Sequence, residues 1–235
     1  MGSGLIIAIV VVGIAVVLGF AYWSYKREKE RKAALAAYAA GHGFQMTDRD
    51  DSLIQRWGEQ VDPFDEGFDK RCENIMRGTW DGRPATLFDY TYHTWETSTD
   101  SNGHTTQHKE SHNVAITAVQ TDRLYPALSV RPEGFLGRTW GRLTNSDIQL
   151  EWEDFNRAFT VNCPDRRFAS DVLTPQMMEM LMQDRDLAWK IVGPDLITMR
   201  AGRNDPDQLE ASMASLDRIL DLVPEHVRQT DWNVR

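Results

Sequence analysis

The chain opens on a long apolar run and then changes to alternating and helical patterns typical of a folded domain. Residues Leu5–Trp23 carry no charged side chain. As a helix rising about 1.5 Å per residue, the run spans roughly 28 Å, close to the hydrocarbon thickness of a bilayer. Tyr22 and Tyr25 near its end favour the headgroup region. The pattern therefore predicts a transmembrane helix, since a core helix is seldom apolar on every side over this length.

The basic residues that follow the run predict its orientation. Five Lys or Arg side chains lie in residues 26–32, and none precedes the run. By the positive-inside rule, the N-terminus lies outside the plasma membrane and the rest of the chain lies in the cytoplasm. A cleaved signal peptide is the alternative, but it needs basic residues before the apolar run and small residues after it.

Strong helix formers continue the span into an Ala-rich segment that Gly41 and Gly43 end. One edge of this helix, with Leu35, Tyr38 and Ala39, is expected to touch the domain. The chain is accordingly divided into a membrane anchor (1–25), a helical stalk (26–43) and a cytoplasmic domain (44–235).

Strands dominate the first half of the domain. Cys72–Trp80 and Pro84–Trp95 flank Asp81-Gly82, a two-residue hairpin signal. Asn113–Thr121 indicates a strand buried on both faces, and a polar stretch, Glu96–Ser111, separates it from the hairpin. Further strands are predicted at Ala127–Val130, Ile148–Trp152 and Phe159–Cys163, and as a hairpin of Leu187–Val192 with Leu196–Arg200.

Helical signals gather in the second half. Thr174 and Pro175 form an N-cap and a first-turn proline. Apolar positions from Leu209 to Val223 recur at helical spacing after Pro206. Helices are predicted at Asp165–Leu173, at Gln176–Gln183 and from Pro206 to Val223. Together the elements predict an α+β fold, a mainly antiparallel sheet with covering helices, with a pleckstrin-homology-like roll as the alternative.

Charge limits the classes of partner. The whole chain carries a formal charge of −9 and residues 26–32 contribute +3, which leaves −12 for the rest. Such an acidic domain repels phosphates, so we expect no nucleic-acid partner. The two cysteines, Cys72 and Cys163, show no metal or redox spacing, and in a cytoplasmic domain both are expected to be reduced.

Histidines in the polar stretch are candidate zinc ligands. His104, His108 and His112 would share one face if the segment were helical. Gly, Ser and Thr throughout the stretch favour a long solvated hairpin loop instead. Zinc binding therefore stays the alternative hypothesis, and no cofactor is predicted.

Arginines give one stretch of the acidic domain a basic bias. Arg131, Arg138 and Arg142 lie among glycines that could let backbone N–H groups reach a phosphate or an anionic headgroup. Ordinary surface arginines are the favoured interpretation. Among the acids, Asp89 with Tyr90 and Tyr92 is a candidate polar cluster. The sequence holds no P-loop, dinucleotide fingerprint, Gly-x-Ser-x-Gly or His-Glu-x-x-His motif.

Four segments are distinctive: Phe88-Asp89-Tyr90-Thr91-Tyr92, Asp147-Ile148-Gln149-Leu150-Glu151, Phe155–Val161 and Asp171–Met178. With them the chain resembles a group of uncharacterised actinobacterial membrane proteins that have one N-terminal span and a domain of unknown function. The likeness covers roughly residues 74–200. The resemblance implies a bacterial plasma membrane and no known activity.

These observations favour a membrane-anchored cytoplasmic binding or scaffold module that contacts the lipid bilayer through Leu5–Trp23 and engages a protein partner or another ligand. An enzyme with an unrecognised active site and an anionic-lipid or anion-sensing domain are the alternatives. Nothing in the sequence predicts an oligomeric state.

Overall fold

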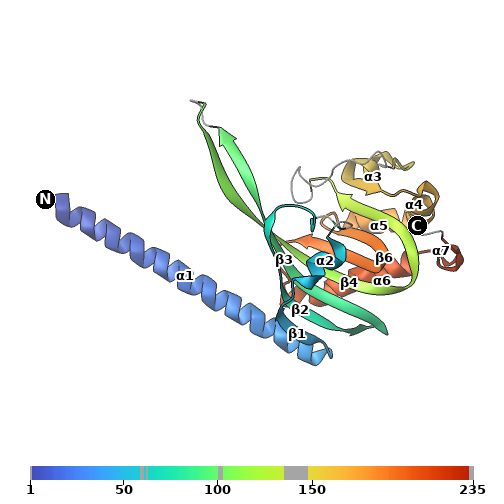
Figure 1. Ribbon diagram of the computed structural model, residues 1–235, viewed down its shortest axis with the longest axis horizontal. Coiled ribbons are helices and arrows are strands. Elements are labelled where there is room, and N and C mark those ends of the chain that lie inside the picture. Colours follow the sequence, from blue (N-terminus) through green and yellow to red (C-terminus); the bar gives the residue numbers. More distant parts are fainter. Residues whose placement is uncertain (1, 59–60, 62, 100–102, 135–147, 233–235) are drawn as a thin grey trace.

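A 40-residue helix, α1 (Gly2–Gly41), extends from the domain as a single rod (Figure 1). The computed structural model describes residues 2–58, 61, 63–99, 103–134 and 148–232. Within it, α1 is long and apolar enough to cross a membrane, and none of its most apolar stretch is buried against the domain. A buried core helix is therefore excluded, and α1 is a candidate membrane anchor.

The C-terminal turns of α1 are built into the domain. Leu35 and Ala39 are fully buried, and half-buried Tyr38 packs beside them. The helix ends at Gly41, and Gly43 has a positive φ of 73° that favours glycine. The predicted contact edge is thus confirmed. It packs the C-terminal turns of α1 against the domain.

In the described part of the chain, six antiparallel strands form one sheet in the order β1-β2-β3-β4-β5, with β6 paired to β4. The predicted α+β class with a mainly antiparallel sheet is confirmed. The strands are β1 (Gln45–Arg49), β2 (Phe68–Trp80), β3 (Arg83–Thr99), β4 (Thr105–Pro132), β5 (Phe159–Asn162) and β6 (Ala188–Ala201).

Strand β4 organises the sheet. Residues Val114–Val119 pair with both β3 and β6, and Ser129 and Val130 pair with both β5 and β6. Two register shifts around Tyr125 let the strand bend without ending. The predicted strands Asn113–Thr121 and Ala127–Val130 are therefore one strand. The predicted hairpin around Gly193-Pro194-Asp195 is likewise wrong, because all three residues lie inside β6.

The polar stretch Glu96–Ser111 is a second correction, because much of it is strand and not loop. Thr94–Thr99 pairs with Thr105–Glu110 beyond the last β2–β3 pair, Phe68 with His93. This two-stranded extension, called the arm below, projects from the sheet (Figure 1). Strands β3 and β4 pair without a break from Ala85↔Val119 to Thr99↔Thr105, so the hairpin extends beyond the rest of the sheet. The polar composition of this stretch gives no sign of this pairing.

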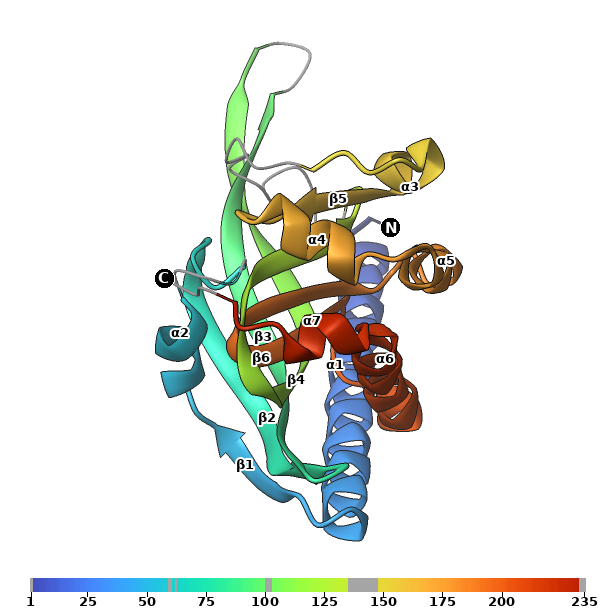
Figure 2. The same ribbon diagram turned by 90° about the vertical axis from the view of Figure 1, so that its right-hand side faces the viewer.

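Helices cover both faces of the sheet. Figure 2 shows α2 on the side opposite α5 and α6. Asp165 accepts bonds from the backbone N–H groups of Arg167 and Phe168, and Thr174 accepts one from Met177, as the sequence predicts. The helices are α2 (Ser52–Trp57), α3 (Glu153–Ala158), α4 (Arg166–Val172), α5 (Pro175–Gln183), α6 (Leu209–Leu222), α7 (Glu225–Gln229) and the 3-10 turn η1 (Pro206–Gln208). The predicted strand at Ile148–Trp152 is wrong, since this segment has no regular structure.

Two hydrophobic cores result, one on each face of the sheet. The helix-side core lies between the sheet and helices α4, α5 and α6, and the α2-side core lies between the sheet and α2. Alternation along the strands divides neighbours between them: Met76 joins the helix-side core, whereas Ile75 joins the α2-side core. Phe88, Tyr90 and Tyr92 all enter the α2-side core, because alternate residues of a strand share one face.

The two cysteines are free and buried, Cys72 in the α2-side core and Cys163 in the helix-side core. The sheet separates the two thiols, so this fold forms no disulfide whichever side of the membrane it occupies.

Candidate functional site

A cavity of about 330 Å³ lies between the sheet and helices α4, α6 and α7. Helices α4 and α7 lie at the end of the domain away from the N-terminus of α1 (Figure 1). The apolar part of its lining comes from three helices, strand β6 and the loops beside them: Phe168, Val172, Ile191, Leu196, Ile219, Leu220, Val223 and Val227.

Charged side chains of both signs surround this apolar floor. Arg83 donates to Asp122 at 3.1 Å, which joins the β2–β3 turn to the middle of β4. Trp80 donates through Nε1 to the carboxylate of Asp217 on α6. The charged lining residues are Asp81, Arg83, Asp122, Arg123, Asp217, Asp221 and Arg228. An apolar interior with a polar border that is nearly balanced in charge suits an amphiphilic molecule.

Local sequence explains how the border is held. Asp81 and Gly82 both have positive φ values, 46° and 75°, which fits the type I′ turn that Asp-Gly predicts. This turn brings Asp81 and Arg83 to the cavity. Opposite it, Arg228 donates to the carbonyl oxygens of Leu220 and Val223 at 2.6 and 3.0 Å, and so binds the C-terminal end of α6.

Tyr125 lies at the irregular point of β4 and supplies a hydrogen-bonding group to the cavity. Its ring stacks on Phe168 with centroids 5.9 Å apart. Burial raises the pKa of Tyr125, so the phenol stays protonated at neutral pH. The described residues that line the cavity include no Cys, His or Lys. The cavity thus offers shape, hydrogen-bonding groups and charge.

A second polar assembly joins α1 to the sheet. Arg31 donates to Asp89 Oδ2 at 2.9 Å and to the carbonyl oxygen of Asn204 at 2.8 Å. Asp89 is 2% exposed and also accepts bonds from Asn74 Nδ2 and from the backbone and side chain of Asn204. Glu28 completes it with two bonds from Arg31. The Arg31–Asp89 bond fixes α1 against β3, and the bonds of Asn74 and Asn204 hold Asp89 in place, so the assembly has a positioning role.

The predicted cluster of Asp89 with Tyr90 and Tyr92 does not form. Asp89 points to the face that carries α1, whereas both tyrosines enter the α2-side core. The reason is strand alternation, which sends neighbouring side chains to opposite faces.

The predicted histidine ligands are spread along a strand. His104 precedes β4, and His108 and His112 lie within it. Four strand residues span about 13 Å, so these three side chains cannot converge on one ion. His108 contacts Glu96 at 3.0 Å and His112 contacts Thr94 at 2.8 Å. Within the described residues, no group of three or more His, Cys, Asp or Glu side chains is placed to bind a metal.

Of the predicted anion-binding arginines, Arg131 is half-buried near the end of β4, opposite Thr160 of β5. Arg138 and Arg142 lie outside the described residues. The anion site stays a prediction.

Sequence reasoning missed the cavity and the role of Arg31. The cavity joins residues from Asp81 to Arg228, so no local pattern marks it. A signal for the α1 contact was present: Asp89 is a lone acid within an aromatic strand, and a buried carboxylate needs a partner.

The fold of this protein is similar to that of a solved structure, whereas its sequence matches no known family. No family model matches the sequence, and no curated protein matches it. A similar solved structure is the crystal structure of the mycobacterial trehalose monomycolate transport factor A, TtfA. The match has a TM-score of 0.58 and 12% sequence identity, and it covers 82% of this chain and 96% of that one. The two proteins share the fold.

Proposed function

We propose that the protein is a membrane-anchored binding module whose cavity holds the apolar part of an amphiphilic ligand. The observation that carries the proposal is the cavity itself, which combines an apolar floor with a border of acids and bases. Its volume of about 330 Å³ is at the small end for ligand pockets. It therefore accommodates one alkyl chain or one apolar group of the ligand and leaves the polar part of the ligand at the border.

Two further observations support this proposal. The border holds four acids and three bases, which favours a neutral polar head group over a strongly charged one. The protein with the similar structure is named as a transport factor for trehalose monomycolate, a lipid. If α1 crosses the bilayer, the Arg31–Asp89 pair would hold the domain beside it, with helices α4 and α7 of the cavity away from the N-terminus of α1 (Figure 1).

We further propose that the domain lies in the cytoplasm, because the basic residues follow the span. A Cys introduced at exposed Leu124 would report this. In intact cells it should resist a membrane-impermeant maleimide and react after lysis. Reaction before lysis would place the domain outside.

Photo-crosslinking tests the cavity. Full-length protein in nanodiscs would be exposed to a sugar-headed alkyl diazirine, and crosslinked peptides would be mapped by mass spectrometry. We expect labelling of peptides from β6 and α6, together with α1, which meets the probe in the lipid. Leu220→Trp, which fills the cavity, should reduce labelling of β6 several-fold and leave that of α1 unchanged.

Leu222→Trp is the matched control, because Leu222 lies on the same helix with similar exposure and does not line the cavity. Labelling confined to α1, or equal labelling of β6 in both variants, would refute the proposed ligand site.

A further inference from the structure

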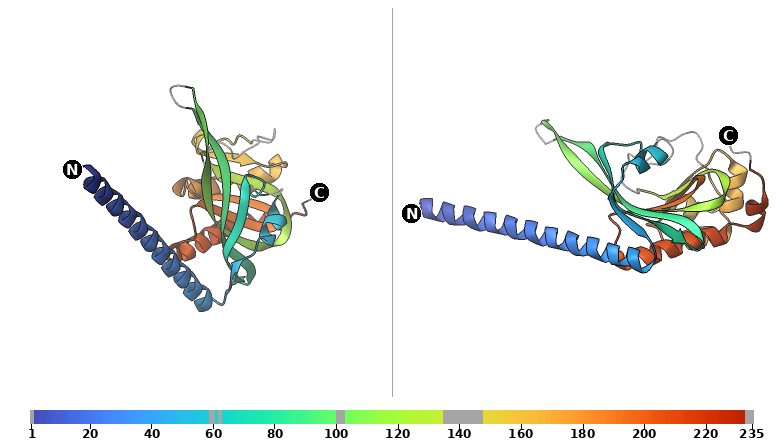
Figure 3. Two further views of the ribbon diagram at one scale, coloured as in Figure 1. Left: turned by 60° about the vertical axis from the view of Figure 1, so that its left-hand side comes forward. Right: turned by 60° about the horizontal axis from the view of Figure 1, so that its bottom comes forward.

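The arm is a described surface that the proposed function does not use. Its two strands pair only with each other beyond His93, and the β3–β4 register has no shift along them. In Figures 1 and 3 the arm and the N-terminal half of α1 project to the same side of the domain. A two-stranded ribbon extended in this direction lies on the same side of the domain as the apolar half of α1, and therefore faces the same surroundings.

The two faces of the arm differ in charge. Asp89 contacts α1, and with a two-residue period His93, Trp95 and Thr97 follow it on that face of β3. Both carboxylates of the described arm, Glu96 and Glu110, belong to the opposite face. Cross-strand partners complete the α1-side face with Lys109, Gln107 and Thr105. This face therefore holds hydroxyl, amide, ammonium and indole groups and no carboxylate of the arm.

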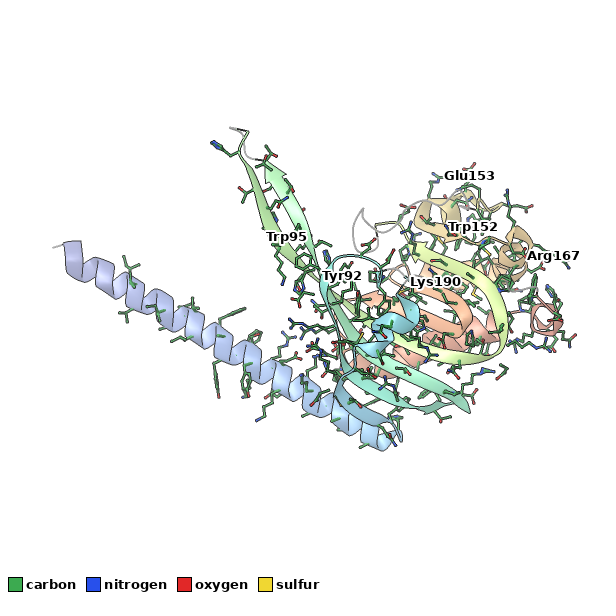
Figure 4. The ribbon with its side chains drawn as sticks, in the orientation of Figure 1. Tyr92, Trp95, Trp152, Glu153, Arg167 and Lys190 are labelled. Carbon is green, nitrogen blue, oxygen red and sulfur yellow. The ribbon has the colours of Figure 1, made fainter. Side chains whose placement is uncertain are left out.

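Trp95 is the exposed aromatic residue of the α1-side face. It is 61% exposed although it stacks on Phe68, with ring centroids 5.1 Å apart. Lys109 Nζ lies 5.5 Å from the centre of the Phe68 ring and donates to Asp69 at 3.1 Å. Figure 4 shows Trp95 where the arm leaves the sheet. An exposed tryptophan beside a lysine is the combination that membrane interfaces favour.

Helix α1 carries the same combination. Arg27 lies 5.4 Å from the centre of the Trp23 ring, at the end of the predicted span. From Arg31, Trp23 is eight residues away, or about 12 Å along the helix. From its partner Asp89, the end of β3 at Thr99 is ten residues away, or about 33 Å along the strand. The arm therefore reaches the level of Trp23 even if it diverges from α1 by about 60°.

We propose that the arm lies on the headgroup layer of the bilayer that α1 crosses, with Trp95 and Lys109 in contact with lipid. Trp95 places its ring at the interface, and the threonines and Gln107 bond to headgroups. With α1 as the first attachment, this contact fixes the rotation of the domain about the helix axis.

Site-directed fluorescence in proteoliposomes tests this proposal. Full-length protein with NBD on Thr97→Cys would be reconstituted in phosphatidylethanolamine and phosphatidylglycerol. Quenching by lipids with a spin label near the headgroup would then be measured. Cys72 and Cys163 are buried, so the dye should enter at the introduced thiol. We expect at least twofold stronger quenching at Thr97→Cys than at its neighbour Ser98→Cys, which belongs to the opposite face.

Two variants complete the design. Trp95→Ser should reduce the quenching at Thr97→Cys to the level of Ser98→Cys. Leu18→Cys in the span should be quenched by lipids labelled deep in the chain, which reports insertion of α1 separately. Equal, low quenching at positions 97 and 98 with a quenched Leu18→Cys would overturn the proposal. That result would leave the arm as a surface for a protein.

Discussion

Arg31 of helix α1 and Asp89 of strand β3 are 58 positions apart in sequence and form an ion pair of 2.9 Å. The Asp89 side chain is 2% exposed and that of Arg31 is 16% exposed, so water screens the pair little. The pair fixes the direction in which α1 leaves the domain, and therefore the orientation of the sheet, the arm and the cavity relative to α1.

Removing the arginine should destabilise the domain. In Arg31→Met, Asp89 keeps its bonds from Asn74 and Asn204 and loses its charge partner. Loss of one partner of a buried pair costs about 3 kcal/mol. Thermal unfolding should show a correspondingly lower Tm. Arg27→Met, whose partner is the exposed ring of Trp23, should change the Tm little. Equal Tm values for the two variants would contradict a structural role for the pair.

Two glycines with similar backbone angles should respond differently to alanine. Gly67 and Gly82 have φ values of 66° and 75°. A Cβ on Gly67 would lie 2.3 Å from the carbonyl oxygen of His93, whereas one on Gly82 meets nothing within 4 Å. Gly82→Ala should cost about 1 kcal/mol of backbone strain, and Gly67→Ala about 3 kcal/mol or more. Urea unfolding of both variants measures the difference in unfolding free energy. A smaller loss of stability for Gly67→Ala would show that the backbone near His93 moves at little cost.

Asp184 and Arg200 should contribute to the acid sensitivity of the fold. The side-chain hydrogen bonds from Arg200 hold the pKa of Asp184 below its ordinary value of 3.8. A carboxylate with a lowered folded-state pKa stabilises fully above its unfolded pKa, and the contribution is lost as the pH falls through the folded one. Wild-type Tm should therefore fall below about pH 4, and the fall should be shallower in Asp184→Asn. Parallel pH profiles of Tm between pH 3 and 7 would contradict this assignment.

Both thiols should be unreactive in the folded protein. Burial raises the pKa of Cys163 to about 11 and that of Cys72 further still. The reactive thiolate is therefore scarce at neutral pH, and access is blocked as well. Ellman's reagent should modify neither thiol within minutes in native buffer and both in denaturant. Rapid reaction of one thiol in native buffer would indicate local opening of the core that holds it.

Local patterns in the sequence determined several elements before any tertiary information. The type I′ turn at Asp81-Gly82, the capped start of α5 at Thr174 and the periodic α6 all formed where predicted. In each case the deciding interactions lie within a few residues: a positive φ, a side chain bonding a nearby N–H, or an apolar stripe on one helix. The uncharged run before Lys26 likewise marks α1 as a candidate span from composition alone.

Only the tertiary structure decided the length of β4, the strand character of the arm and the site. The histidine stretch is polar, and pairing with β3 makes it strand. The cavity needs a turn, a bent strand and three helices in one place. Arg31 finds Asp89 only when α1 packs on the sheet, because the free energy of that contact depends on long-range burial. Short-range periodicity carries no information about such contacts.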